Sequence, residues 1–236
     1  MRIIPNILTL FNLFLGCVTT LLLIEGNLPM ESISLLILIA LFFDFMDGLI
    51  ARKFNLESKL GAQLDSLADL ISFGLVPGII MYNLFLEVSS DPYLPLLGFT
   101  ITLASAYRLA NFNLSKNDDN YFKGLPTPAN TVFILSLMLI IELPNIDSFI
   151  KEIILDNNFL IIITVLSCYL LNSRFKLLNL KFKDFKLRGV NKYRYLLIVL
   201  SAILFVFLRS ALLIPVILVI YYIVSYFAIG RKKRSG

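Results

Sequence analysis

Four aspartates stand in or beside segments of this chain that are otherwise apolar. Asp44 and Asp47 are three residues apart, and Asp65 and Asp69 are four residues apart. On a helix, both spacings put the two side chains on one face, so each helix presents a pair of carboxylates. An ionised carboxylate at membrane depth is costly unless it meets a cation, a partner or water. The four carboxylates therefore predict a site for divalent metal ions, because hard cations such as Mg²⁺, Mn²⁺ and Ca²⁺ prefer oxygen ligands.

The residues between the two pairs favour a phosphate ligand. Four carboxylates can hold two metal ions, and two ions about 4 Å apart are a recurrent arrangement for phosphoryl chemistry. Gly48 and Gly61 leave room for a ligand or a neighbouring helix, and Arg52 lies one turn beyond Gly48, where its guanidinium can meet a phosphate. Ala51 keeps the adjacent surface small, and Ser58 can donate a hydrogen bond to a phosphate or a sugar.

The composition is that of a membrane protein. Of the 236 residues 58% are hydrophobic and 16% are charged, whereas a soluble domain is nearer half apolar and about a quarter charged. The chain has no histidine, which excludes a histidine base, a histidine metal ligand and a Ser-His-Asp triad and leaves proton transfer to Asp, Glu, Lys, Tyr or Cys. Cys17 and Cys168 lie in apolar runs, and we expect them to pack in the core without a disulfide.

Eight apolar segments predict an all-α, polytopic bundle of about eight transmembrane helices. The first is expected to be retained rather than cleaved as a signal peptide. No linker, repeat or low-complexity stretch divides the chain, so residues 1–236 are expected to form a single integral membrane domain. The segments are 6–25, 31–50, 62–87, 93–114, 127–143, 157–173, 195–208 and 211–229.

The basic residues predict the orientation of this bundle. With both termini in the cytoplasm, all lysines and arginines except Lys151 and Arg209 fall on the inner side, as the positive-inside rule requires. The aspartates then lie at the cytoplasmic face. The basic segment 174–194 and the terminal residues 231–234 either anchor the adjacent helices or lie on the anionic inner leaflet. Nucleic acid is not an expected partner, because these charges flank membrane spans.

The spacing of the charged and small residues resembles the signature of the CDP-alcohol phosphatidyltransferase family at every fixed position. The resemblance implies a six-helix core, here with two further helices, and two divalent cations, Mg²⁺ or Mn²⁺, with Ca²⁺ possible in a structure. It implies that Asp44 and Asp65 bridge the ions, that Asp47 and Asp69 complete the two sites, and that Asp69 is the catalytic base. The matching sequence is Asp44-x2-Asp47-Gly48-x2-Ala51-Arg52-x8-Gly61-x3-Asp65-x3-Asp69.

Three further stretches resemble the membrane-embedded phosphatidylserine synthases within that family. They read IPNILTLFNLFLGC, SAYRLANFNL and KGLPTPAN, in this order along the chain. The resemblance implies transfer of the phosphatidyl group of CDP-diacylglycerol to L-serine, with CMP as the second product, in a homodimer in the cytoplasmic (inner) membrane. Glycerol 3-phosphate or an inositol phosphate remains an alternative acceptor. A cation transporter remains a remote alternative, since carboxylate rings also line cation channels.

Two groups of residues are expected to contact the substrates. One face of the first helix points polar groups inward near the cytoplasmic end, where they can meet the cytidine or its phosphates or pack against other helices. The end of the fourth span and the start of the fifth can meet the acceptor, although anchoring and helix-capping roles are open for Arg108 and Thr127. The residues of the CDP-diacylglycerol group are Asn6, Thr9, Asn12, Gly48, Ala51, Arg52, Ser58 and Gly61, and those of the acceptor group are Arg108, Asn111, Lys123, Pro126 and Thr127.

Overall fold

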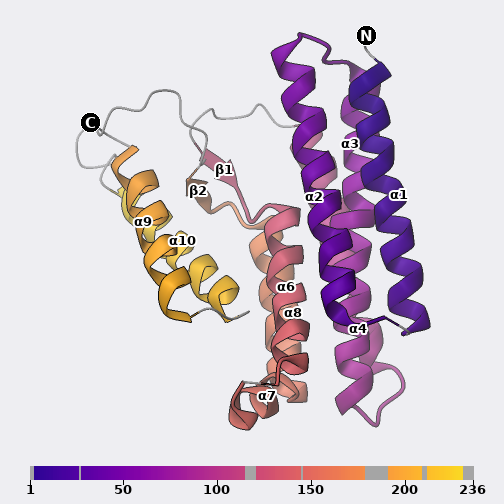
Figure 1. The fold of residues 1–236 in the computed structure, drawn as a ribbon, viewed down its shortest axis with the longest axis vertical. Helices are drawn as coiled ribbons and strands as arrows, with labels where there is room; N and C mark the ends of the chain where they lie inside the picture. The colour runs from indigo at the N-terminus through magenta and orange to yellow at the C-terminus, as the bar shows by residue number, and fades with distance from the viewer. Residues whose placement is uncertain are drawn as a thin grey trace.

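The computed structural model describes residues 3–26, 28–114, 121–144, 146–178, 191–208 and 212–230, which form a bundle of helices (Figure 1). All eight apolar segments predicted from the sequence correspond to helices, so the all-α prediction is confirmed. The elements in chain order are α1 (Ile3–Glu25), α2 (Met30–Lys53), α3 (Lys59–Leu70), the π-helix η1 (Ile71–Leu75), α4 (Val76–Val88), the 3₁₀-helix η2 (Leu94–Gly98), α5 (Phe99–Leu114), β1 (Tyr121–Lys123), α6 (Thr127–Glu142), α7 (Ser148–Ile154), α8 (Asn157–Asn172), β2 (Lys176–Leu178), α9 (Asn191–Leu208) and α10 (Leu213–Gly230).

The bundle has the surface of a membrane protein. Leu35, Leu38 and Phe42 of α2 are more than half exposed, and such apolar side chains are stable against lipid but not in quantity against water. Within the described residues, α1, α2 and the continuous helix Lys59–Val88 are long and apolar enough to cross a membrane, and α7 with α8, bent by 62°, make a fourth candidate. The predicted count of about eight crossings therefore stays a prediction.

The core is centred on α4. Residues on every side of this helix are buried, among them Val76, Ile80, Leu84 and Phe85, and α1, α5, α6 and α8 all contact it. Because its side chains are covered by other helices on every side, α4 does not face lipid. α4 is therefore the fixed element against which the neighbouring helices are placed.

A small antiparallel sheet, which the sequence did not predict, joins α10 to the bundle. Its strands β1 and β2 pair with Tyr121 opposite Leu178 and Lys123 opposite Lys176. The backbone N–H of Leu178 donates to Ser225 Oγ at 3.2 Å, and its carbonyl accepts from the Tyr221 hydroxyl at 2.8 Å. Three-residue strands are too short to show an alternating pattern, so only the pairing in space reveals them.

The remaining sequence predictions about the fold have mixed outcomes. Cys17 and Cys168 are both free, as expected, but Cys17 is exposed on the outside of α1, so its predicted core packing is wrong. A helix facing lipid can carry a small apolar side chain outward at no cost. Most of the basic segment 174–194, together with residues 231–234, lies outside the described residues.

Candidate metal and substrate site

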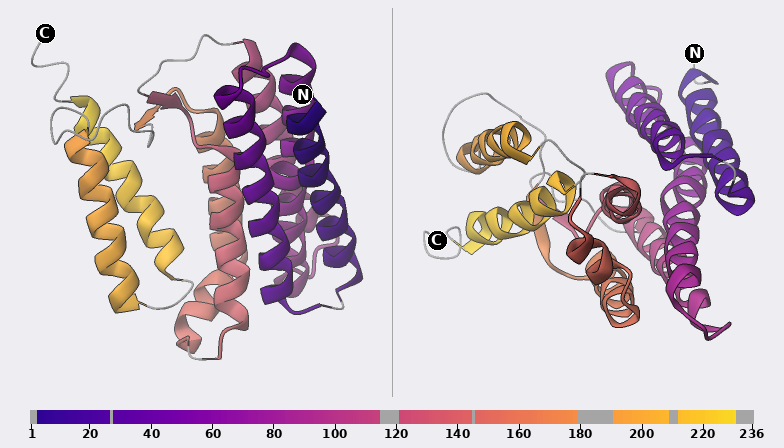
Figure 2. Two further views of the ribbon diagram at one scale, coloured as in Figure 1. Left: turned by 45° about the horizontal axis from the view of Figure 1, so that its top comes forward. Right: turned by 60° about the horizontal axis from the view of Figure 1, so that its bottom comes forward.

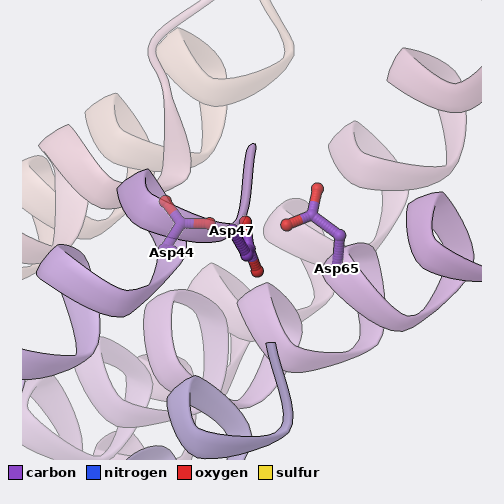
Figure 3. Close-up of side chains that lie close together, drawn as sticks. All are labelled: Asp44, Asp47 and Asp65. Atoms are coloured by element: carbon purple, nitrogen blue, oxygen red, sulfur yellow. The ribbon is translucent and has the colours of Figure 1, made fainter. Parts of the chain in front are cut away.

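Three of the four aspartates meet between α2 and α3, which both pack against α1. Figure 3 shows Asp44 and Asp47 of α2 and Asp65 of α3, with the carboxylates of Asp44 and Asp65 on either side of Asp47. One carboxylate oxygen from each of the three lies within 4.8 Å of the others. The connection between α2 and α3 is at the end of the bundle where α1 begins and where β1 and β2 lie (Figures 1 and 2). The two aspartate-bearing helix faces predicted from the sequence therefore meet at one end of the molecule.

Asp47 is held in place by the first helix. Its side chain is 4% exposed, and its Oδ2 accepts a hydrogen bond from the hydroxyl of Thr9, which is 3% exposed. The same hydroxyl lies 3.0 Å from the carbonyl of Pro5. A charge-assisted hydrogen bond between two buried groups fixes the direction of the carboxylate. Thr9, which was expected to contact the nucleotide, therefore contacts a metal-ligand candidate directly.

Asp69 lies one turn beyond Asp65 on α3 and is half-buried. Its side chain interacts with that of Asp44, and its Oδ1 has no hydrogen-bond partner among the described residues. The guanidinium of Arg108, on α5, is close enough to attract it. A carboxylate oxygen buried without a donor is costly, so this oxygen needs a ligand or a proton.

These residues fit a divalent cation. The ligand atoms are carboxylate oxygens alone, which suit Mg²⁺ or Mn²⁺ and do not suit soft metals. Like charges this close repel one another strongly in a partly desolvated site, and a cation between them removes that repulsion. The cluster could thus hold metal.

The small and basic residues around the cluster take the places that the sequence predicts. A Cβ added to Gly48 would lie 3.4 Å from the Arg52 guanidinium, so this side chain folds back over the glycine. The guanidinium also interacts electrostatically with Asp47 and Asp65. The Ala51 side chain is half-buried on the same helix. Arg52 therefore stands beside the carboxylates, where it can bind a phosphate attached to a bound metal.

Ser58 and Gly61 form the start of α3 and face α1. The backbone N–H of Gly61 donates to Ser58 Oγ at 2.9 Å, which makes Ser58 the N-cap of α3. This capping bond uses the oxygen as an acceptor, so the hydroxyl hydrogen remains available for the phosphate or sugar contact predicted from the sequence. A Cβ on Gly61 would lie 3.2 Å from Asn6 Oδ1, which places the side chain of Asn6 next to the cap.

Asn12 completes the polar face of α1. It is 0% exposed, and neither amide atom of its side chain has a hydrogen-bond partner among the described residues. Buried amides are almost always paired. The unpaired Asn12 amide therefore marks a place for a polar ligand, in line with the predicted nucleotide contact.

The residues predicted to meet the acceptor divide into two groups. Arg108 faces Asp69, and Thr127 is the first residue of α6, is buried and has an unpartnered hydroxyl within the described part of the chain. By contrast, Asn111 and Lys123 are exposed. Pro126 is the residue before α6 and contributes no side-chain hydrogen bond. Of these five residues, Arg108 lies near an aspartate, Asp69, and Thr127 is buried at the start of α6.

Two buried polar residues were not predicted. Asn130 lies three residues after Thr127 on α6, and Ser105 lies three residues before Arg108 on α5. Both are 0% exposed, and their side-chain polar atoms have no hydrogen-bond partner among the described residues. Their helical spacing from Thr127 and Arg108 was a signal in the sequence, since residues three apart share a face.

Comparison with known proteins agrees with the geometry. Residues 2–171 match the family model described as CDP-alcohol phosphatidyltransferase. The chain is 34% identical over 129 residues to the CDP-diacylglycerol–serine O-phosphatidyltransferase of Bacillus subtilis (strain 168), a match that spans 54% of this chain and 71% of the relative.

Two other relatives match over smaller shares of their own length. The archaetidylserine synthase of Methanothermobacter thermautotrophicus is 35% identical over 139 residues, which is 58% of each chain. The CDP-diacylglycerol–serine O-phosphatidyltransferase of Saccharomyces cerevisiae is 35% identical over 130 residues, or 51% of this chain and 43% of the relative. The match thus spans about half the length of these two relatives. The family model ends before α9 and α10, so the similarity concerns the helices that build the site.

Proposed function

Because the chain belongs to the CDP-alcohol phosphatidyltransferase family, we propose that it transfers the phosphatidyl group of CDP-diacylglycerol to L-serine, giving phosphatidylserine and CMP. The observation that carries the transfer chemistry is the meeting of Asp44, Asp47 and Asp65 within 4.8 Å. Serine is supported by the relatives described above, because two are serine O-phosphatidyltransferases and the third is an archaetidylserine synthase.

Two divalent cations are part of the proposal. Asp44, Asp47, Asp65 and Asp69 would hold them. When bound, the cations supply positive charge that stabilises the diphosphate and the departing CMP. Arg52 binds a phosphate of the liponucleotide from the same side, and the α1 residues Asn6, Thr9 and Asn12 line the nucleotide, with Thr9 acting through Asp47.

Asp69 is the proposed general base. In the transfer step it accepts the proton of the serine hydroxyl, the serine oxygen attacks the phosphorus that bears the diacylglycerol, and the bond from that phosphorus to CMP breaks. A base must lie within hydrogen-bond reach of the proton it removes. The buried, unpartnered Oδ1 of Asp69 supports this role.

The acceptor subsite is proposed to lie between α5 and α6. Serine is a compact zwitterion whose carboxylate requires a cation and whose ammonium requires oxygen acceptors. Arg108 provides the cation, and the unpartnered oxygens of Ser105, Thr127 and Asn130 provide the acceptors. Arg108 is also drawn to Asp69, so a serine held by its carboxylate has its hydroxyl near the base.

The site is proposed to face the cytoplasm, where serine is soluble. The charge distribution of the sequence supports this orientation, and so does the position of the α2–α3 connection at the end of the bundle where α1 begins (Figure 1). On the basis of the family resemblance, we also propose that the protein forms a homodimer in the inner membrane.

An acceptor assay tests the function. The purified protein is incubated with CDP-diacylglycerol, Mn²⁺ and one alcohol at a time, and CMP and lipid products are measured. We expect CMP and phosphatidylserine with L-serine, and none with glycerol 3-phosphate or an inositol phosphate. CMP release with glycerol 3-phosphate but not with serine would refute the serine assignment and leave the family chemistry intact.

A further inference from the structure

The helix that carries Asp65 and Asp69 contains one π-helical turn, η1, directly after Asp69. The backbone N–H of Val76 donates to the carbonyl of Ile71, five residues back. Such a turn accommodates one residue more than the α-helix around it, and π-turns within α-helices are frequent at functional sites. The carbonyls of Phe73 and Gly74 lie in this turn, and that of Phe73 has no backbone donor four residues further on because that residue is Pro77.

Hydroxyl groups from two other helices satisfy those carbonyls. Thr131 of α6 donates to the carbonyl of Phe73 at 3.0 Å, and Thr102 of α5 donates to the carbonyl of Gly74 at 3.0 Å. On the third side, the Ser72 hydroxyl donates to the carbonyl of Asn12 in α1 at 2.9 Å. Three consecutive residues of η1 are therefore bound to three different helices.

Close packing holds the same turn. A Cβ on Gly16 of α1 would lie 2.3 Å from Ser72 Oγ, and a Cβ on Gly74 would lie 3.1 Å from the Cβ of Ser105. Both glycines let a neighbouring helix approach at a distance that no larger residue permits. The turn is thus enclosed by α1, α5 and α6 rather than exposed to lipid.

The π-turn decides which way the carboxylates face. α4 is buried on all sides, whereas α3 packs against α1 and α5 with only Ala68 fully buried, so the turn between them sets how α3 is oriented relative to the core. One residue of an α-helix corresponds to a rotation of about 100°. If the turn changed its register by one residue, the face bearing Asp65 and Asp69 would rotate by about that angle relative to α4.

We propose that Thr131 and Thr102 are positioning residues for Asp69, acting through the carbonyls of η1. By donating to the carbonyls of Phe73 and Gly74 from α6 and α5, they hold the turn that precedes Pro77 in its observed shape and so keep Asp69 directed at Asp44 and the acceptor. This assignment rests on the proposed function for its catalytic consequence, but the positioning itself does not require turnover.

The test uses Thr131→Val and Thr102→Val, which remove the hydroxyl and keep the branched shape. Mn²⁺ affinity is measured without substrate, and kcat and KM are measured with CDP-diacylglycerol and L-serine. Since a small misplacement of a reacting group can cost as much as 10²-fold in rate, we expect each variant to lower kcat about tenfold and to weaken Mn²⁺ binding, with KM for CDP-diacylglycerol within about twofold of wild type. Thr131→Ser, which retains the hydroxyl, should restore both.

Thr164→Val is the matched control. The Thr164 hydroxyl is equally buried but donates to the carbonyl of Leu160 in its own helix, α8, at 2.7 Å. This variant should lower only the unfolding temperature.

Two results would overturn the proposal. One is that Thr131→Val and Thr102→Val behave like Thr164→Val. The other is that Thr131→Val raises only the KM for serine, because the Thr131 hydroxyl also lies 3.0 Å from the carbonyl of Thr127 and would then serve the acceptor subsite. If the wild-type protein released no CMP with any alcohol, the proposed function would fail, while the Mn²⁺ comparison would still decide the positioning.

Discussion

The contact between α1 and the carboxylate cluster predicts that Thr9→Val weakens metal binding while the fold persists. The Thr9 hydroxyl and the Asp47 carboxylate are both almost fully buried and are hydrogen-bonded to each other. Valine has nearly the same shape, so the substitution leaves no cavity. It removes the hydroxyl that donates to Asp47 Oδ2, so this carboxylate oxygen loses that hydrogen bond.

The size of the effect follows from the strength of that bond. A hydrogen bond to a charged group contributes about 1.5–3 kcal/mol, and about 1.4 kcal/mol is a factor of ten in affinity. Without the Thr9 donor, Asp47 can turn away from the other carboxylates in the metal-free variant and must turn back to bind metal, so most of the loss falls on the bound state. We therefore expect the Kd for Mn²⁺ to rise about 10- to 100-fold, the range typical for loss of a group that orients a metal ligand.

Electron paramagnetic resonance of free Mn²⁺ during titration of the purified protein measures this Kd. Thr9→Ser keeps the hydroxyl and should bind Mn²⁺ within about threefold of wild type, well below the effect of losing an orienting group. Thr19→Val is the control on the same helix, because the buried Thr19 hydroxyl donates only to the carbonyl of Leu15 at 2.8 Å. If Thr9→Val were folded and bound Mn²⁺ as tightly as Thr19→Val, the orienting role of Thr9 would be wrong.

Three further predictions concern the other parts of the site. Asp69→Asn should lower the rate of CMP release with serine by at least about 10²-fold, the scale of general-base catalysis, with CDP-diacylglycerol binding retained; a near-normal rate would exclude Asp69 as the base. Arg52→Lys should raise the KM for CDP-diacylglycerol about tenfold with little change in kcat, because a planar two-pronged donor is lost, and an unchanged KM would argue against a phosphate contact. Gly98→Ala should strongly lower the unfolding temperature, since its Cβ would lie 2.6 Å from the carbonyl oxygen of Gly78 and from the backbone nitrogen of Tyr82; a stable variant would show that η2 can move away from α4.

The carboxylate faces and the helices that carry them could be predicted from the sequence because they depend on local spacing. Asp44 with Asp47, and Asp65 with Asp69, share a helix face whatever the rest of the chain does. The position of Arg52 over Gly48 likewise needs only one turn of α2. Each of the eight apolar runs predicted a helical segment, since length and hydrophobicity are properties of each segment alone, but they did not predict the short helix α7 or the division of 62–87 into α3, η1 and α4.

The tertiary structure decided which polar groups meet across helices. Thr9 and Asp47 are 38 residues apart, and Thr131 and Phe73 are 58 residues apart. No spacing rule relates such pairs, because their contact depends on how α1, α2, α6 and η1 pack. Pro77 marks this position in the sequence, because it has no backbone N–H to donate to the carbonyl of Phe73 four residues earlier, but only the packing shows which hydroxyl groups donate to that carbonyl instead. The sequence therefore determined which residues could do the chemistry, and the packing of the helices determined the direction in which Asp69 faces.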